Sequence, residues 1–189
     1  MSIGVFYGRM NPFTRGHASV LKEIRKNKRN PVIIVSHTKN NNKNPLTANQ
    51  KINIIKKSLT GQNNVKVMAT SKSMPTIFNA LKILKTNNPN IQVYLGSNRI
   101  LTLGASLQKS GYFVKQFGKN RTNNGVSGTR SRAAARAYNN KTFKNMMTPG
   151  LNSPTLKSIM QTIRNQTAPK RVRNSSPPKS ARKRKTPVV

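Results

Sequence analysis

Acidic residues are almost absent from this chain. Its 189 residues include 36 lysines and arginines but one carboxylate side chain, that of Glu23, which gives a formal net charge of +35. An average soluble chain of this length would carry roughly 23 acids, so missing acids contribute more to the charge than extra bases do. Such a chain repels itself and has almost no internal pairing to offset the repulsion. We therefore expect it to work bound to a polyanion, with nucleic acid as the first candidate.

Cysteine is missing altogether, which excludes disulfide bonds and cysteine metal sites. With two histidines and one glutamate the chain has too few other ligands for a metal cluster, so we predict no metal site. No apolar run approaches the ~20 residues of a membrane span, and no basic segment leads into an apolar one as in a secretory signal. A basic helix with a bulky aromatic face, suited to an anionic membrane, is also lacking. We expect an intracellular protein, in a virion interior or a nucleus, with no membrane partner and no secretion.

Short apolar runs alternate with helix-length segments over the first two-thirds of the chain. This alternation predicts an α/β fold with a single doubly wound parallel sheet, right-handed crossovers and helices on both faces. Ligands of such a sheet bind at the carboxyl ends of the strands. The predicted strands are residues 3–7, 31–35, 65–68, 91–95 and 112–114, and the predicted helices between them are about 18–29, 48–59 and 75–84.

Beyond Val126 the pattern becomes helical, with helices expected to begin near Ser127, Asn140 and Ser153. From about residue 166 the periodicity ends, and basic residues lie among prolines and serines that cannot bury enough apolar surface to order the chain. We therefore predict an α/β domain over residues 1–165 and a disordered basic tail over residues 166–189. The tail residues expected to contact nucleic acid are Lys170, Arg171, Arg173, Lys179, Arg182, Lys183, Arg184 and Lys185.

The segment from Ser175 to Lys185 resembles the Ser-Pro and Lys/Arg-rich tails of linker histones. Such tails neutralise phosphates without reading sequence, and the resemblance favours DNA over RNA as the partner. A nuclear-import signal centred on Arg182 to Lys185 is a second interpretation, compatible with the first. RNA and polyphosphate remain alternatives.

A phosphate-binding loop is predicted between the first strand and the first helix. The sequence from Gly8 to His17 is GRMNPFTRGH, in which a glycine permits close backbone approach and the following helix N-terminus offers unpaired N–H groups. His17 can donate to a phosphate oxygen. The segment resembles the T/HxGH signature of the nucleotidylyltransferase superfamily, which includes cytidylyltransferases, nicotinamide-mononucleotide adenylyltransferases and related phage and viral proteins.

Three later segments extend the resemblance to about residues 2–165. Asn44 to Thr47, followed by Lys51, is similar to the family's nPLs…K segment, which shapes the substrate side of the site. Gly96 to Arg99, after the fourth strand, looks like the family's GxDR. Val126 to Arg132 looks like its ISSTxxR motif, which binds the triphosphate tail of the nucleotide. The resemblance implies a Rossmann-like nucleotidyltransferase fold.

The resemblance also implies an activity, the transfer of a nucleotidyl group from a nucleoside triphosphate to a phosphate or carboxylate acceptor with release of pyrophosphate. An active enzyme would use ATP or CTP with Mg²⁺ held largely by the phosphates. Thr14 and His17 would then stabilise charge at the α-phosphate, and Arg132 would hold the departing phosphates. The implied nucleotide-binding residues are Gly8, Arg9, Asn11, Gly16, Gly96, Asn98, Ser127, Gly128 and Thr129.

The departures from the family pattern replace acids with amides. Asn98 stands where the family usually has Asp, and Asn49 and Gln50 stand where an acid is common. An amide keeps hydrogen bonding but loses charge, so the pattern indicates charge removal from an enzyme fold. Our leading hypothesis is a nucleotidyltransferase-like scaffold that binds nucleic acid irrespective of sequence and condenses or packages DNA, for instance viral DNA. For this scaffold, both lost and retained catalysis are open. The alternatives are an active nucleotidyltransferase and an RNA-binding component of a ribonucleoprotein.

The same residues have structural explanations. Thr14, Ser127 and Thr129 are of types that cap helices, and His17 could bond locally in an inactive scaffold. His37, at the end of the second predicted strand, is expected to be structural.

Overall fold

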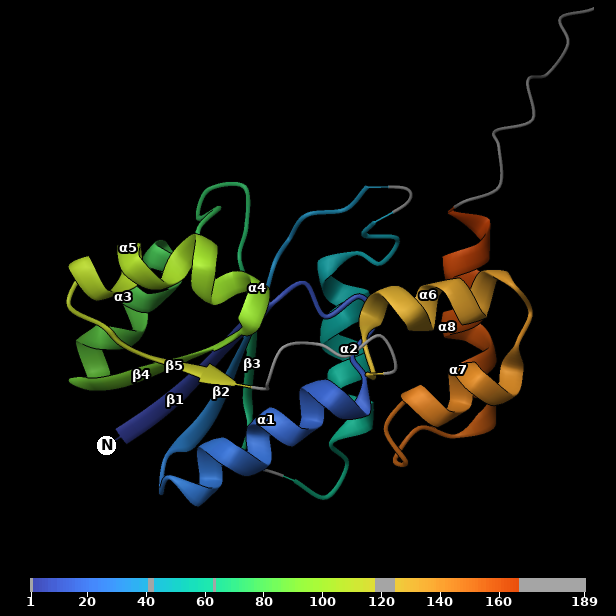
Figure 1. Cartoon of the computed structure of the whole chain (residues 1–189), viewed down its shortest axis with the longest axis horizontal. Coiled ribbons are helices and arrows are strands. Elements are labelled where there is room, and N and C mark those ends of the chain that lie inside the picture. The colour runs from blue at the N-terminus through green and yellow to red at the C-terminus, as the bar shows by residue number, and fades with distance from the viewer. Residues whose placement is uncertain (1, 41–42, 63, 118–124, 167–189) are drawn as a thin grey trace, which may run out of the picture.

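Five parallel strands form one sheet at the centre of the protein (Figure 1). The structure is a computed structural model that describes residues 2–40, 43–62, 64–117 and 125–166. The strand order is β3-β2-β1-β4-β5, and every neighbouring pair is parallel. The strands are β1 (Ser2–Gly8), β2 (Asn30–Val35), β3 (Lys66–Ala69), β4 (Asn90–Gly96) and β5 (Phe113–Phe117). All five predicted strands are confirmed, with bounds that differ by at most three residues.

Helices cover both faces of the sheet, so the predicted doubly wound α/β architecture is confirmed. Alternate residues of each strand point to opposite faces: Phe6 and Ile33 belong to one buried cluster, and Val5 and Val32 to the other. The first cluster lies under α1 (Arg15–Lys26) and α2 (Ala48–Ser58), and the second under α3 (Ile77–Asn87) and α5 (Ala105–Lys109).

Three further helices lie together at the carboxyl end of the sheet (Figure 1). They are α6 (Gly128–Arg136), α7 (Asn140–Met146) and α8 (Ser153–Asn165), which begin within one residue of the predicted positions. Their buried side chains, among them Ala135, Phe143 and Ile159, extend the first cluster. The eight basic residues assigned to the tail, Lys170 to Lys185, lie outside the described residues.

The sequence analysis missed the helical connection between β4 and β5. This connection consists of α4 (Ser97–Arg99), the π-helical turn η1 (Ile100–Gly104) and α5. Its apolar residues do not follow one helical stripe, because Leu101 is 87% exposed whereas Leu107 is buried. The first helix also begins earlier than predicted, at Arg15, because Thr14 is its N-cap.

The helix N-termini carry neutral caps. Thr47, Thr76 and Ser127 accept hydrogen bonds from backbone N–H groups three residues ahead. No described helix has an acidic residue in its first turn. The positive ends of the helix dipoles are therefore not neutralised by carboxylates.

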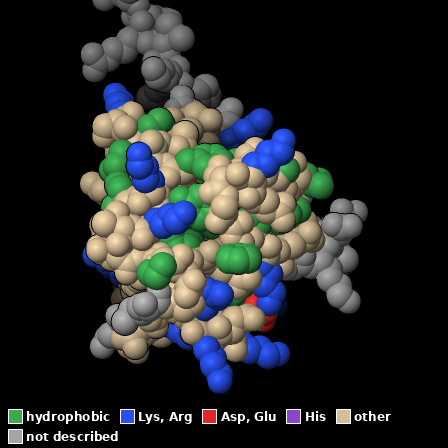
Figure 2. Space-filling model, turned by 90° about the vertical axis from the view of Figure 1, so that its left-hand side faces the viewer, with side chains coloured by type: hydrophobic (Ala, Val, Ile, Leu, Met, Phe, Trp, Pro, Cys, Tyr) green, Lys and Arg blue, Asp and Glu red, His purple; other side chains and the backbone are tan. Residues whose placement is uncertain are grey.

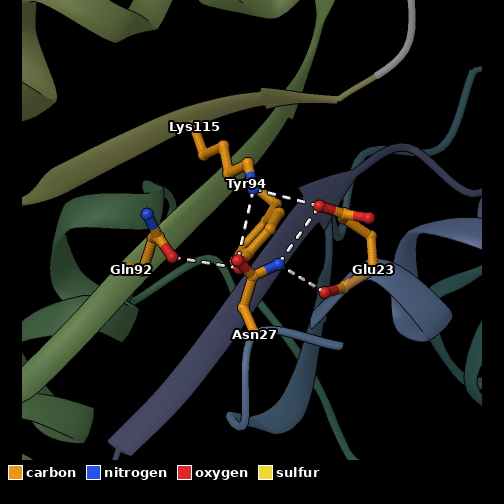
Figure 3. Close-up of polar contacts among 5 residues, drawn as sticks. All are labelled: Glu23, Asn27, Gln92, Tyr94 and Lys115. Carbon is orange, nitrogen blue, oxygen red and sulfur yellow. Dashed lines mark hydrogen bonds and ion pairs between the residues drawn. The ribbon is translucent and has the colours of Figure 1, made fainter. Parts of the chain in front are cut away.

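The one carboxylate side chain of the protein joins α1 to the edge strand β5. Lys115 Nζ lies 3.0 Å from Glu23 Oε1 and 3.3 Å from Asn27 Oδ1 (Figure 3). Asn27 Nδ2 donates to Glu23 Oε1 at 3.1 Å. The hydrogen bonds from Lys115 and Asn27 lower the pKa of Glu23. Glu23 Oε1 is thus engaged by two side chains within the fold.

Basic side chains are scattered over the described surface, and Glu23 is the one acidic side chain in the sequence. Figure 2 shows Lys and Arg spread over one face, with hydrophobic side chains between them and acidic atoms in a single place. Among the described helices, none is long and apolar enough to cross a membrane.

Gly4 on β1 offers a test of the packing between the sheet and α1. A Cβ at this position would overlap Ile24 and lie 3.1 Å from the Tyr94 ring, whereas a Cβ at Gly96 would meet no atom within 4 Å. We expect Gly4→Ala to lower the free energy of unfolding by about 1–3 kcal/mol through overpacking. Gly96→Ala should change it by less than about 0.5 kcal/mol. Urea denaturation measures both, and equal effects would contradict the packing described.

Candidate functional site

A cavity of about 450 Å³ lies at the carboxyl ends of β1 and β4. The chain moves from β1 to β2 and β3 on one side, and then crosses to β4 and β5 on the other. Loops leaving β1 and β4 therefore diverge, and open sheets bind ligands at such a point. The cavity is lined by Phe6, Tyr7, Gly8, Arg9, Met10, Asn11, His17, Gly96, Arg99, Thr102, Gly128, Thr129 and Arg132.

The structure brings most of the predicted site residues together. The lining contains eight of them, from three separate segments: Gly8, Arg9, Asn11, His17, Gly96, Gly128, Thr129 and Arg132. Ser127 lies just behind as the cap of α6, and Thr14 is fully buried. Asn98 lies in α4 at the end of β4, but its side chain is outside what the structure describes.

Two glycines allow the N-terminus of α6 to reach the loop between β1 and α1. A Cβ at Gly128 would lie 3.1 Å from the carbonyl oxygen of Asn11, and one at Gly16 would lie 3.1 Å from that of Val126. A larger residue at either position would push the start of α6 away from the loop between β1 and α1. Gly16 therefore supports the site by packing closely against the backbone of Val126.

His17 and Thr14 form a capping box at the start of α1. The backbone N–H of Thr14 donates to His17 Nδ1 at 3.0 Å, and Thr14 Oγ1 lies 2.9 Å from the same nitrogen. Because Nδ1 accepts, Nε2 carries the proton of the neutral ring. The rings of Phe6 and Phe13 flank the imidazole, with centroids 6.0 and 5.7 Å away. Thr14 thus positions the His17 ring. The bond at Nδ1 is compatible with a phosphate-binding role for His17, because that role would use the other ring nitrogen, Nε2.

Arg132 is a buried cation held by neutral groups. It is 9% exposed; Nη1 donates to the Asn11 carbonyl at 2.6 Å and Nη2 to Thr129 Oγ1 at 3.2 Å. Burial, and then the positive charges of Arg136 and Arg9, lower the pKa of Arg132 to about 10. Its Nε and the Nδ2 of Asn11, which is 2% exposed, have no hydrogen-bond partner in the part of the chain described. These donors favour an anion at the site.

Arg99 is a site residue that the sequence reasoning missed. Its guanidinium lies 5.4 Å from the Tyr7 ring centre, and both residues line the cavity together with Thr102. The sequence contained a pointer to Arg99, since this residue ends the segment that resembles the family's GxDR motif. No sequence pattern pointed to Thr102 or Tyr7 as site residues.

The donor set does not suit a divalent metal ion held by the protein. No carboxylate lines the cavity. No group of three or more His, Cys, Asp or Glu side chains exists in the described ranges. The cavity therefore offers no carboxylate to the magnesium ion that the sequence resemblance implies, and the phosphates would have to hold that ion. The donors of the cavity suit phosphate oxygens.

Lys51 and His37 support the loop after β2 from outside the cavity. Lys51 is fully buried, and its Nζ donates to the carbonyl oxygens of Ser36 at 2.8 Å and Thr38 at 2.9 Å. It is absent from the lining that its comparison with the family's substrate-side segment suggested. The backbone N–H of His37 donates to Thr70 Oγ1 at 2.9 Å, and His37 Nδ1 lies 2.8 Å from the same oxygen. These bonds are consistent with a structural role for His37.

The match to a known family agrees with this geometry. The sequence model of the cytidylyltransferase-like family matches residues 5–154, a range that contains every segment of the cavity. The chain belongs to the cytidylyltransferase-like family. No curated protein matches this cytidylyltransferase-like chain.

Solved structures share the fold of this family member. The nicotinic acid mononucleotide adenylyltransferase of Plasmodium falciparum, complexed with NaAD, is 18% identical with a TM-score of 0.60, and the match covers 85% of this chain and 95% of that one. The bifunctional NMN adenylyltransferase/ADP ribose pyrophosphatase of Francisella tularensis, complexed with AMP and a Mn ion, is 21% identical with a TM-score of 0.62. That match covers 88% of this chain and 52% of the bifunctional protein. At these identities the likeness shows the Rossmann-like nucleotidyltransferase fold.

The buried Lys51 predicts a pH dependence of stability. Burial, with a smaller effect of the Arg9 charge, lowers the pKa of Lys51 to about 8 from its usual 10.5. Between these values the unfolded chain binds more protons, so the free energy of unfolding rises with pH. From pH 7 to pH 10 we expect wild type to gain about 2 kcal/mol more than Lys51→Met, by urea denaturation. Equal gains in both proteins would contradict the assignment.

Proposed function

We propose that this protein is a nucleotidyltransferase-like scaffold that binds nucleic acid irrespective of sequence and condenses or packages DNA. The proposal is carried by one observation: the fold has a single carboxylate side chain, Glu23, which is already engaged by Lys115. The other basic residues have no carboxylate side chain to pair with inside the chain. Nucleic-acid phosphates would supply the missing counter-charge.

The dispersed distribution of the positive charge supports nucleic-acid binding without sequence preference. On the face shown in Figure 2 the basic side chains are dispersed, as suits contacts with phosphates that position a duplex but read no bases. A charge of +35 would match the phosphates of at most about 17 base pairs. The likeness of Ser175 to Lys185 to linker-histone tails favours DNA, in a virion interior or a nucleus.

Salt dependence tests this function. Because binding would release counterions from many phosphates, raising salt from about 50 to 200 mM should weaken DNA affinity by roughly 10³-fold or more. Duplexes of equal length and different sequence should bind within about twofold of each other. Fluorescence anisotropy with labelled duplexes measures both quantities. Affinity that is insensitive to salt, or one strongly preferred sequence, would refute the proposal.

A variant of the full chain with a changed tail measures how much the basic cluster at residues 182–185 contributes to DNA binding. Replacing Arg182, Lys183, Arg184 and Lys185 with glutamine should lower the slope of log affinity against log salt by about 3 to 4. The residual slope measures the folded domain together with the four remaining basic tail residues, Lys170, Arg171, Arg173 and Lys179. A slope that falls to zero would restrict nucleic-acid binding to the tail.

A second candidate function, nucleotidyl transfer, is favoured by the cavity. The first motif and the α6 motif, separated by about 110 residues, meet there at two helix N-termini. Backbone N–H groups at helix N-termini are natural phosphate ligands. The neutral His17 ring and the buried Arg132 add directed donors to the same space.

These residues have defined tasks in the transfer reaction. An oxygen of the acceptor forms a bond to the α-phosphorus while the bond from that phosphorus to the bridging oxygen of the β-phosphate breaks, releasing pyrophosphate. The Nε2–H of His17 would donate to an α-phosphate oxygen as charge develops there. Arg132 and the amides at the start of α6 would hold the departing phosphates. Positioning and electrostatic stabilisation would supply the rate enhancement, without a covalent protein intermediate.

The two histidines provide a matched pair for testing catalysis. Incubation with each nucleoside triphosphate and small phosphate acceptors should release pyrophosphate, and His17→Ala should lower the rate by about 10²-fold or more. His37→Ala should retain the wild-type rate, because His37 lies outside the cavity lining. Absence of pyrophosphate with every nucleotide, or equal rates in the two variants, would argue against this function.

A further inference from the structure

The cavity wall carries an uncompensated positive charge. Three arginines, Arg9, Arg99 and Arg132, line it together with His17, and no carboxylate does. The only carboxylate side chain in the sequence, Glu23, is held by Lys115 and Asn27. The wall therefore has three positive charges and no internal counter-charge.

The wall also contains polar donors that lack acceptors. Arg132 Nε and Asn11 Nδ2 are both buried, and neither has a hydrogen-bond partner in the described ranges. The Arg132 guanidinium adjoins the backbone of Asn11, since Arg132 Nη1 donates to the Asn11 carbonyl oxygen. Unpaired buried donors are costly, so an acceptor that a bound anion brings next to either residue would be favourable.

The arginines of the wall repel one another. Burial and the charges of Arg136 and Arg9 together depress the pKa of Arg132. A ligand that brings its full negative charge relieves this repulsion more than one whose charge is already neutralised. The unliganded cavity therefore favours a polyanion that has no metal ion bound to it.

A divalent metal ion would oppose this arrangement. A triphosphate carries about four negative charges, and bound Mg²⁺ cancels about two of them. In this cavity the ion would face three arginines and find no carboxylate ligand. We propose that the cavity binds the phosphate chain of a nucleoside triphosphate as the metal-free anion, with Arg9, Arg99 and Arg132 supplying the positive charge. The proposal rests on the nucleotide site argued above.

Calorimetric titration with ATP, in excess EDTA or excess Mg²⁺ at physiological ionic strength, tests it. ATP should bind about tenfold more tightly in EDTA than in Mg²⁺. Binding that Mg²⁺ leaves unchanged or tightens would overturn metal-free binding while leaving the nucleotide site intact. Absence of saturable binding in both buffers would overturn the site and the inference together.

Gly96 allows the charge of the cavity to be changed without changing its shape. It lines the cavity with φ −69°, and a Cβ there meets no atom within 4 Å, so Asp and Asn should both fit. Gly96→Asp adds a carboxylate, and Gly96→Asn is its uncharged counterpart.

In EDTA, the Gly96→Asp variant should bind ATP about tenfold more weakly than the Gly96→Asn variant. In Mg²⁺ the two affinities should differ less, because the ion cancels part of the negative charge that the added carboxylate repels. Because the two variants share the rest of the basic surface, the difference reports on the cavity alone. Equal thermal midpoints would show that both fold alike. Equal ATP affinities in EDTA for the two folded variants would overturn the proposal.

Discussion

A chain with 36 basic residues and one carboxylate side chain must fold without the ion pairs that other proteins use. Its stability rests on two apolar clusters, one on each face of the sheet, and on neutral hydrogen bonds. Hydroxyls and amides cap the helices where acids are common elsewhere, as Thr47 with Gln50 and Thr76 with Asn79 illustrate. The ion pair between Glu23 and Lys115 ties the edge strand β5 to α1. The other basic residues have no carboxylate side chain to pair with.

The cavity follows the same constraint on a smaller scale. Arg132 is fixed by a carbonyl and a hydroxyl, so it is positioned without losing its charge. His17 is oriented by the backbone of Thr14, again without a carboxylate. A nucleotide site and a nucleic-acid surface both require phosphate recognition. A lack of acids would favour both, so the proposed nucleic-acid surface and the cavity are compatible in one fold.

Local patterns predicted the parts of this fold that depend on local physics. Apolar runs such as Ile3 to Tyr7 gave the strands, and the alternation with helices gave the doubly wound sheet. The loop from Gly8 to His17 could be placed at the carboxyl edge because it directly follows a strand. Features set by long-range packing could not be predicted. The burial of Lys51 depends on two carbonyl oxygens of another segment, and the entry of Arg99 into the cavity depends on a π-helical connection with no clear periodicity.

The central claim is that phosphates from outside supply the missing counter-charge. Its most direct test is the phosphate content of the protein isolated from its native source at low salt, with the bound polyanion identified by nuclease digestion. The account predicts bound nucleic acid with phosphates in a number approaching the net charge of +35 per chain, released by high salt. A native protein that carries no nucleic acid or other phosphate polymer would contradict it.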